Sequence, residues 1–165
     1  MRWILLSVSA VVALLLEVTL FDRMEVGGAR PDLALALALL VALTSRRLDL
    51  VCGATWLTGL LVDFISGTRF GTYSLQFLIA AMAAYGLKRI VSGDSIPGQV
   101  VLVGAIVLAV NLMDGLWVLR ETHGVGTGLV AWHAAATALY TAVLVPFLSW
   151  AGKPIFLKFG REAEF

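Results

Sequence analysis

Six long apolar runs fill most of this chain of 165 residues. Hydrophobic residues make up 60% of the chain and charged residues only 14%, far from the balance of a soluble domain. A bilayer core about 30 Å thick needs roughly 20 helical residues per crossing, so the length suffices for about six spans with short loops. The sequence therefore predicts an all-α polytopic membrane protein: one transmembrane domain, a six-helix bundle, with spans at residues 3–21, 31–44, 50–65, 70–87, 99–119 and 127–150.

The run at 31–44 is the shortest of the six. Its residues give about 21 Å of helix, so it would cross a bilayer only with local thinning or in a re-entrant shape. A bundle of five spans therefore remains an alternative. Pro31 and Asp32 suit the first turn of this helix, because proline has no N–H to leave unpaired and aspartate favours the positive end of the helix dipole.

The basic residues predict the orientation. With six spans, eight of the 12 Lys and Arg residues fall on the side that holds both termini and four on the other side. The positive-inside rule then puts both termini in the cytoplasm. The tail at 151–165 mixes basic and aromatic residues, so it either lies along the anionic inner leaflet or is a plain polar tail.

Several function classes find no support in the sequence. The formal net charge of +1 gives no ground for a nucleic-acid partner. An HExxH zinc helix, a GxSxG nucleophile elbow and a GxxxxGK[ST] phosphate loop are all missing from the sequence. The single cysteine, Cys52, cannot form an internal disulfide or a thiolate cluster. We therefore predict no enzymatic activity, no catalytic residues, no metal and no cofactor.

The polar residues inside the apolar runs gather in one half of the predicted bundle. Apart from residues at the ends of the runs, such as Asp32, only three charged residues interrupt them: Glu17, Asp63 and Asp114. Given cytoplasmic termini, these carboxylates lie about 3 to 12 Å below the outer surface, and Gln76, Asn111 and His133 share that depth. A lone histidine with no second histidine at ligand spacing favours packing over metal binding.

Helical spacing aligns these polar residues with small residues, in three stripes. The stripes are Cys52, Thr55, Gly59 and Asp63; Asn111, Asp114 and Gly115; and His133, Thr137, Tyr140 and Thr141. Two explanations stay open. The helices could converge on a polar cavity open to the outside that binds a small ligand or part of a partner. Alternatively, the carboxylates pair with Arg69, Arg120 or hydrogen-bond donors and join the helices.

One stretch of the chain, from Pro31 to Arg89, carries a recognisable combination of motifs. It opens with PDLALALALLVAL and continues, after two arginines, with GATWLTGLLVDFISGTRFGTYSLQFL. This stretch resembles the rod shape-determining protein MreD family. The resemblance covers about a third of the chain and leaves Asn111 and Asp114 outside its motifs. The residues that carry it are Pro31, Asp32, Gly53, Gly59, Asp63, Gly67, Gly71 and Tyr73.

The resemblance implies a nonenzymatic component of the bacterial inner membrane, in the machinery that elongates the side wall. Members of the family associate with MreC, a single-span protein with a large periplasmic part. Through MreC they reach the MreB filaments, the glycosyltransferase RodA and its partner transpeptidase. The implied fold is similar to the substrate-binding subunits of vitamin (ECF-type) transporters, a six-helix bundle with an outward-facing pocket.

On this interpretation the chain is a scaffold that binds the transmembrane helix and periplasmic stem of MreC, surrounded by membrane lipids. Gly53 and Gly59 would pack against the partner, and Asp63, Arg69 and Tyr73 would shape the outer rim. The alternative function is an outward-facing small-molecule binding subunit of a membrane transporter. In that case Asp63, Asp114 and His133 would contact the ligand.

Overall fold

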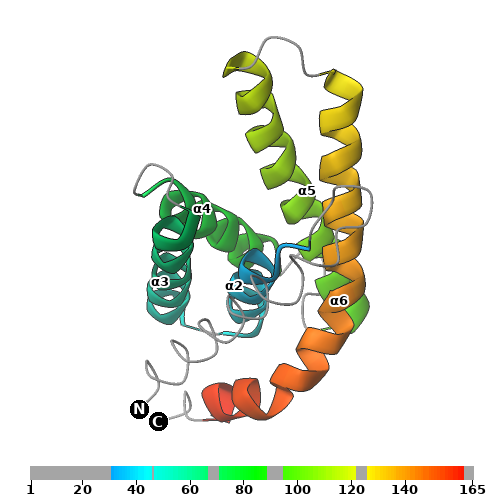
Figure 1. Ribbon diagram of the computed structural model, residues 1–165. Helices are drawn as coiled ribbons and strands as arrows, with labels where there is room; N and C mark the ends of the chain where they lie inside the picture. Colours follow the sequence, from blue (N-terminus) through cyan, green and yellow to red (C-terminus); the bar gives the residue numbers. More distant parts are fainter. Residues whose placement is uncertain (1–30, 46, 67–70, 89–94, 122–125, 162–165) are drawn as a thin grey trace.

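The computed structural model describes residues 31–45, 47–66, 71–88, 95–121 and 126–161 (Figure 1). The predicted run at 3–21 lies outside this part of the chain. The described residues form five helices: α2 (Leu33–Thr44), α3 (Leu48–Ser66), α4 (Thr72–Leu87), α5 (Ile96–Glu121) and α6 (Thr127–Arg161).

These helices overlie five of the six predicted apolar runs. Three of them, α3, α5 and α6, are long and apolar enough to cross a membrane, whereas α2 and α4 are shorter. The chain is therefore a helical membrane protein by the length and composition of its helices. Helix α6 continues past residue 150, so the predicted tail begins as helix. Its C-terminal part bends (Figure 1), and Pro146 and Pro154 lie there, each lacking the N–H of a regular helical bond.

Helix α2 occupies the centre of the described fold. It contacts each of the other four helices, and nine of its 12 residues are buried. Its sequence alternates alanine with leucine, so small side chains let neighbouring helices approach while Leu35, Leu39 and Leu43 fill the core. The chain itself covers this helix, which explains how so short a helix can be apolar on every side.

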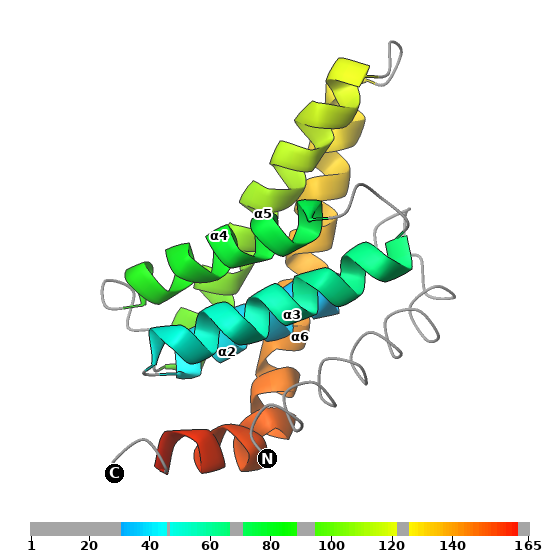
Figure 2. The same ribbon diagram turned by 90° about the vertical axis from the view of Figure 1, so that its left-hand side faces the viewer.

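The other helices form two antiparallel pairs around α2. Helices α3 and α4 lie side by side along it, and α5 and α6 form a long hairpin (Figure 1). The group α2–α4 crosses this hairpin steeply (Figure 2). The end of the hairpin near residues 121–126 extends beyond the group (Figure 1). Large apolar side chains of that end are exposed: Met113, Leu116, Trp117, Leu129 and Trp132.

A hydrogen bond joins α2 and α4 at the end opposite to their N-termini. The Lys88 ammonium donates to the Ser45 carbonyl oxygen at 2.6 Å, just beyond the end of α2. The same ammonium lies 4.0 Å from the centre of the Tyr85 ring, a cation–π contact. The two helices therefore end at the same level, as expected for helices that run in the same direction.

Helices α3 and α4 approach each other most closely at Gly59. A Cβ atom on residue 59 would overlap Ser74 Cα and would lie 2.8 Å from the Ser74 nitrogen and 2.9 Å from the Tyr73 oxygen. Those neighbours are backbone atoms and cannot rotate away. Only glycine fits this crossing. The surface of α3 at Gly59 is therefore covered by α4 of the same chain.

We expect Gly59→Ala to destabilise the protein by at least about 1–3 kcal/mol, because the added methyl group forces α3 and α4 apart. Gly86→Ala is the matched control, since a Cβ atom at this exposed position of α4 meets nothing within 4 Å. Thermal unfolding of both variants in detergent measures the difference. Equal melting temperatures for the two variants would contradict the close crossing.

Candidate functional site

Asp63, the carboxylate near the end of α3, binds the N-terminus of α4. Its carboxylate accepts hydrogen bonds from the backbone N–H groups of Gly71 at 3.1 Å, Tyr73 at 3.0 Å and Ser74 at 3.2 Å. The Ser74 hydroxyl donates a fourth hydrogen bond at 2.5 Å. Asp63 is 1% exposed, and both of its carboxylate oxygens accept hydrogen bonds.

Local chemistry explains this junction between α3 and α4. The first N–H groups of a helix have no partner within the helix, and the helix dipole adds positive charge there. The cap residue Gly71 has φ of 95°, a left-handed conformation that glycine adopts without strain. Its own side chain offers no acceptor, so the buried carboxylate of Asp63 satisfies the helix end instead.

A second set of hydrogen bonds fixes the N-terminus of α2. Asp32 is the N-cap, and its Oδ1 accepts the N–H of Leu35 at 2.9 Å. The backbone N–H of Asp32 donates to Thr141 Oγ1 on α6 at 3.1 Å. Pro31 beside it is fully buried. The start of α2 is therefore attached directly to α6, 109 residues further along the chain.

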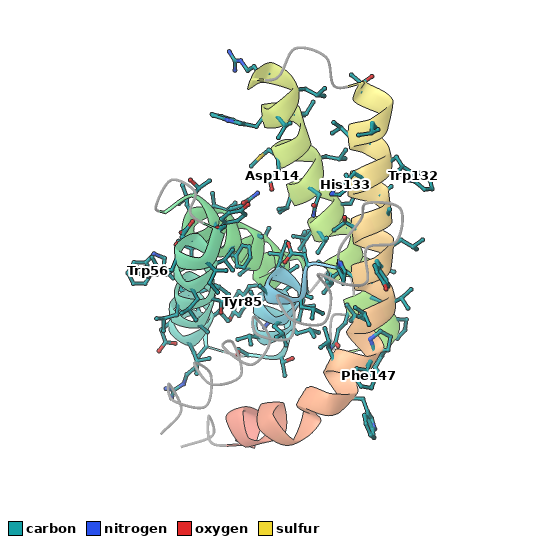
Figure 3. All side chains as sticks on the ribbon, in the orientation of Figure 1. Trp56, Tyr85, Asp114, Trp132, His133 and Phe147 are labelled. Carbon is teal, nitrogen blue, oxygen red and sulfur yellow. The ribbon has the colours of Figure 1, made fainter. Side chains whose placement is uncertain are left out.

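Asp114 connects α5 to α4. Its Oδ1 accepts a hydrogen bond of 2.7 Å from Gln76 Nε2. In Figure 3, Asp114 lies on the side of α5 that faces α4. One side-chain hydrogen bond thus joins α4 to α5, two residues along α4 from Ser74.

The remaining candidate residues take no part in these contacts between helices. Asn111 donates to the Val107 oxygen of its own helix at 2.9 Å. Gly53 is partly buried in α3, and His133 on α6 is exposed. Gly67 and Arg69 lie outside the described residues. Among the residues the structure describes, no group of three or more His, Cys, Asp or Glu could hold a metal ion.

Of the two explanations for the intramembrane carboxylates, the geometry favours the one in which they pair with hydrogen-bond donors and join the helices. Asp63 and Asp114 both pair with hydrogen-bond donors of a neighbouring helix, and the donors are backbone N–H groups, a serine and a glutamine. Sequence reasoning did not select Ser74, and it noted only the depth of Gln76. The sequence signal for Ser74 is its place in the first turn after Gly71, where a hydroxyl can meet an acid that binds the helix end.

No family model, curated protein or solved structure matches this chain. The resemblance to the MreD family therefore stays a prediction, and the functional argument depends on the residues and their geometry.

We expect Asp63→Asn to lower the free energy of unfolding by at least about 2 kcal/mol, because the amide removes the charge and leaves buried donors of α4 unpaired. Asp49→Asn is the control: Asp49 is exposed in the first turn of α3, and its replacement costs less than about 1 kcal/mol. Thermal unfolding in detergent measures both values. A loss for Asp63→Asn no larger than that of the control would show that the junction contributes nothing to stability.

Proposed function

We propose that this protein is a nonenzymatic scaffold of the bacterial inner membrane, similar to the MreD family, that binds MreC in the complex that elongates the rod. Through MreC it would act with MreB, RodA and its partner transpeptidase to organise side-wall peptidoglycan synthesis and cell shape. One observation carries the proposal: residues on which the resemblance depends meet at one helix junction. Gly59, Asp63, Gly71 and Tyr73 all belong to that junction.

The junction has the properties of a structural element. Both carboxylate oxygens of Asp63 accept hydrogen bonds from the N-terminus of α4, so Asp63 is not available as a nucleophile or a general base. The left-handed Gly71 and the close contact at Gly59 hold the backbone in one arrangement. A motif that builds a fixed rim supports a scaffold better than it supports catalysis.

We choose the contact surface for MreC from the helix faces that no other described helix covers. Gly59 packs against α4, so it cannot pack against a second protein. The protruding end of the α5–α6 hairpin exposes Leu116 (64%) and Trp132 (66%). Large apolar and aromatic side chains dominate the binding energy of most protein interfaces. We therefore assign MreC docking to this end of the hairpin.

The topology belongs to the same proposal. Residues 3–21 would add a first span, which gives six helices, cytoplasmic termini and the arrangement of the vitamin-transporter subunits. Lys88 and Ser45 would then face the cytoplasm, and Asp63 and Gly71 the periplasm. The alternative, a small-molecule binding subunit, uses the same topology but needs a ligand instead of a protein partner.

We expect tagged full-length chain to recover co-expressed MreC from membranes in mild detergent, and Trp132→Ala with Leu116→Ala to lower the recovery about tenfold. Trp56→Ala is the matched control, because Trp56 is also exposed (52%) but points outward from α3, across the molecule from Trp132 (Figure 3). Recovery is measured by immunoblot, normalised to the amount of tagged chain.

Two outcomes would contradict this proposal. Failure of the unmodified chain to recover MreC would remove the scaffold function, and a rise in melting temperature with a small organic metabolite would then favour the alternative. Equal recovery by the hairpin variant and the control would move the docking surface away from the hairpin.

We expect cysteine labelling to separate the two ends of the helices. The native Cys52 is first replaced by serine. A membrane-impermeant maleimide added to intact spheroplasts then labels Arg120→Cys and leaves Arg47→Cys unlabelled until the membrane is opened. Both positions are exposed, so access depends only on the side of the membrane. Labelling of Arg47→Cys in intact spheroplasts would reverse the proposed orientation.

A further inference from the structure

Helices α5 and α6 are in close contact at Gly115, near the protruding end of their hairpin. A Cβ atom on residue 115 would overlap Val130 Cγ1 and would lie 3.5 Å from Val130 Cβ. Nearer the start of α5, a Cβ atom on Gly104 would lie 3.3 Å from Ala142 Cβ, a contact that a small adjustment relieves. Residue 115 therefore has no room for a methyl group, whereas residue 104 almost has.

The side chain that faces Gly115 is a stiff one. Val130 lies near the start of α6, and a valine in a helix has one strongly preferred χ1 rotamer. Rotation of this valine is therefore a costly way to make room for a methyl group on residue 115. Movement of α5 away from α6 is the other way, so the missing side chain at Gly115 sets the distance between the two helices at this level.

The protruding end of the hairpin depends on this contact more than the rest of the hairpin does. Helices α2 and α4 also contact α5, and the buried α5 residues Leu102, Val103 and Val107 lie toward its start. None of the residues 113–120 and 126–133 is buried. The bond from Gln76 to Asp114 holds α5 there but does not reach α6. Packing of α5 against α6 therefore fixes their relative position at this end.

The contact lies beside both residues that the proposed function assigns to docking. Leu116 follows Gly115 in α5, and Trp132 lies two residues after Val130 in α6. A partner that binds both docking residues has to match the distance between the two helices. We infer that Gly115, through its contact with Val130, is a positioning residue that sets the spacing of the docking side chains. The inference rests on the proposed function and adds to it the contact that shapes the docking surface.

The test measures recovery of co-expressed MreC by the tagged full-length chain from membranes in mild detergent, normalised to the amount of tagged chain. We expect Gly115→Ala to lower the recovery about fivefold, because docking has to force the helices back against the added methyl group. Gly104→Ala is the matched control. It makes the same substitution in the same helix against a mild contact, and it should keep the recovery within about twofold of the unmodified chain.

A second substitution separates positioning from a general loss of stability. Val130→Ala removes the Cγ1 atom that the new methyl group would overlap and leaves Cβ at 3.5 Å, an ordinary contact. Gly115→Ala combined with Val130→Ala should therefore restore the recovery to within about twofold of the unmodified chain. If the two residues contributed only packing energy, the double variant would lose at least as much recovery as Gly115→Ala alone.

The outcomes distinguish this inference from the proposed function. If the unmodified chain recovers MreC, normal recovery by Gly115→Ala overturns the inference alone. Equal losses for Gly115→Ala and Gly104→Ala, or no restoration in the double variant, also overturn the inference and leave the proposed function intact. If the unmodified chain recovers no MreC, the proposed function is wrong and the inference is wrong with it.

Discussion

The bond between Asp63 and the N-terminus of α4 is the interaction on which the rest of the structure depends. A buried carboxylate in an apolar protein is costly, and so is a buried helix end with unpaired N–H groups. Each satisfies the other here, through three backbone N–H groups and the Ser74 hydroxyl. The junction sets how α3 meets α4 and brings Gly59 against the backbone of Ser74.

The other polar contacts extend from this junction. With α4 fixed, Gln76 reaches Asp114 on α5, and at the start of α2 the Asp32 N–H reaches Thr141 on α6. In a protein with so few polar groups inside, these bonds determine the register of helices that apolar packing alone leaves free to slide. The leucines and alanines of α2 then fill the space between the two helix pairs.

The proposed function uses two parts of this architecture. The polar junction and the crossing at Gly59 hold α3 against α4, and in the proposed function the exposed end of the α5–α6 hairpin would offer a surface to a partner helix. A scaffold requires a stable crossing of this kind, because a partner docked on the hairpin is positioned only as well as the hairpin is held.

The sequence by itself determined where α2 to α6 lie, because long apolar runs have to form helices in a membrane, and it identified Asp32 as a residue suited to open α2. It also predicted one depth for Asp63, Asp114 and Gln76. Only the tertiary structure decided their partners: Ser74 for Asp63, Gln76 for Asp114, and Thr141 for the N–H of Asp32. The central position of α2 likewise could not be predicted from the sequence. A lipid-facing and a protein-facing leucine have the same hydropathy, and only packing distinguishes them.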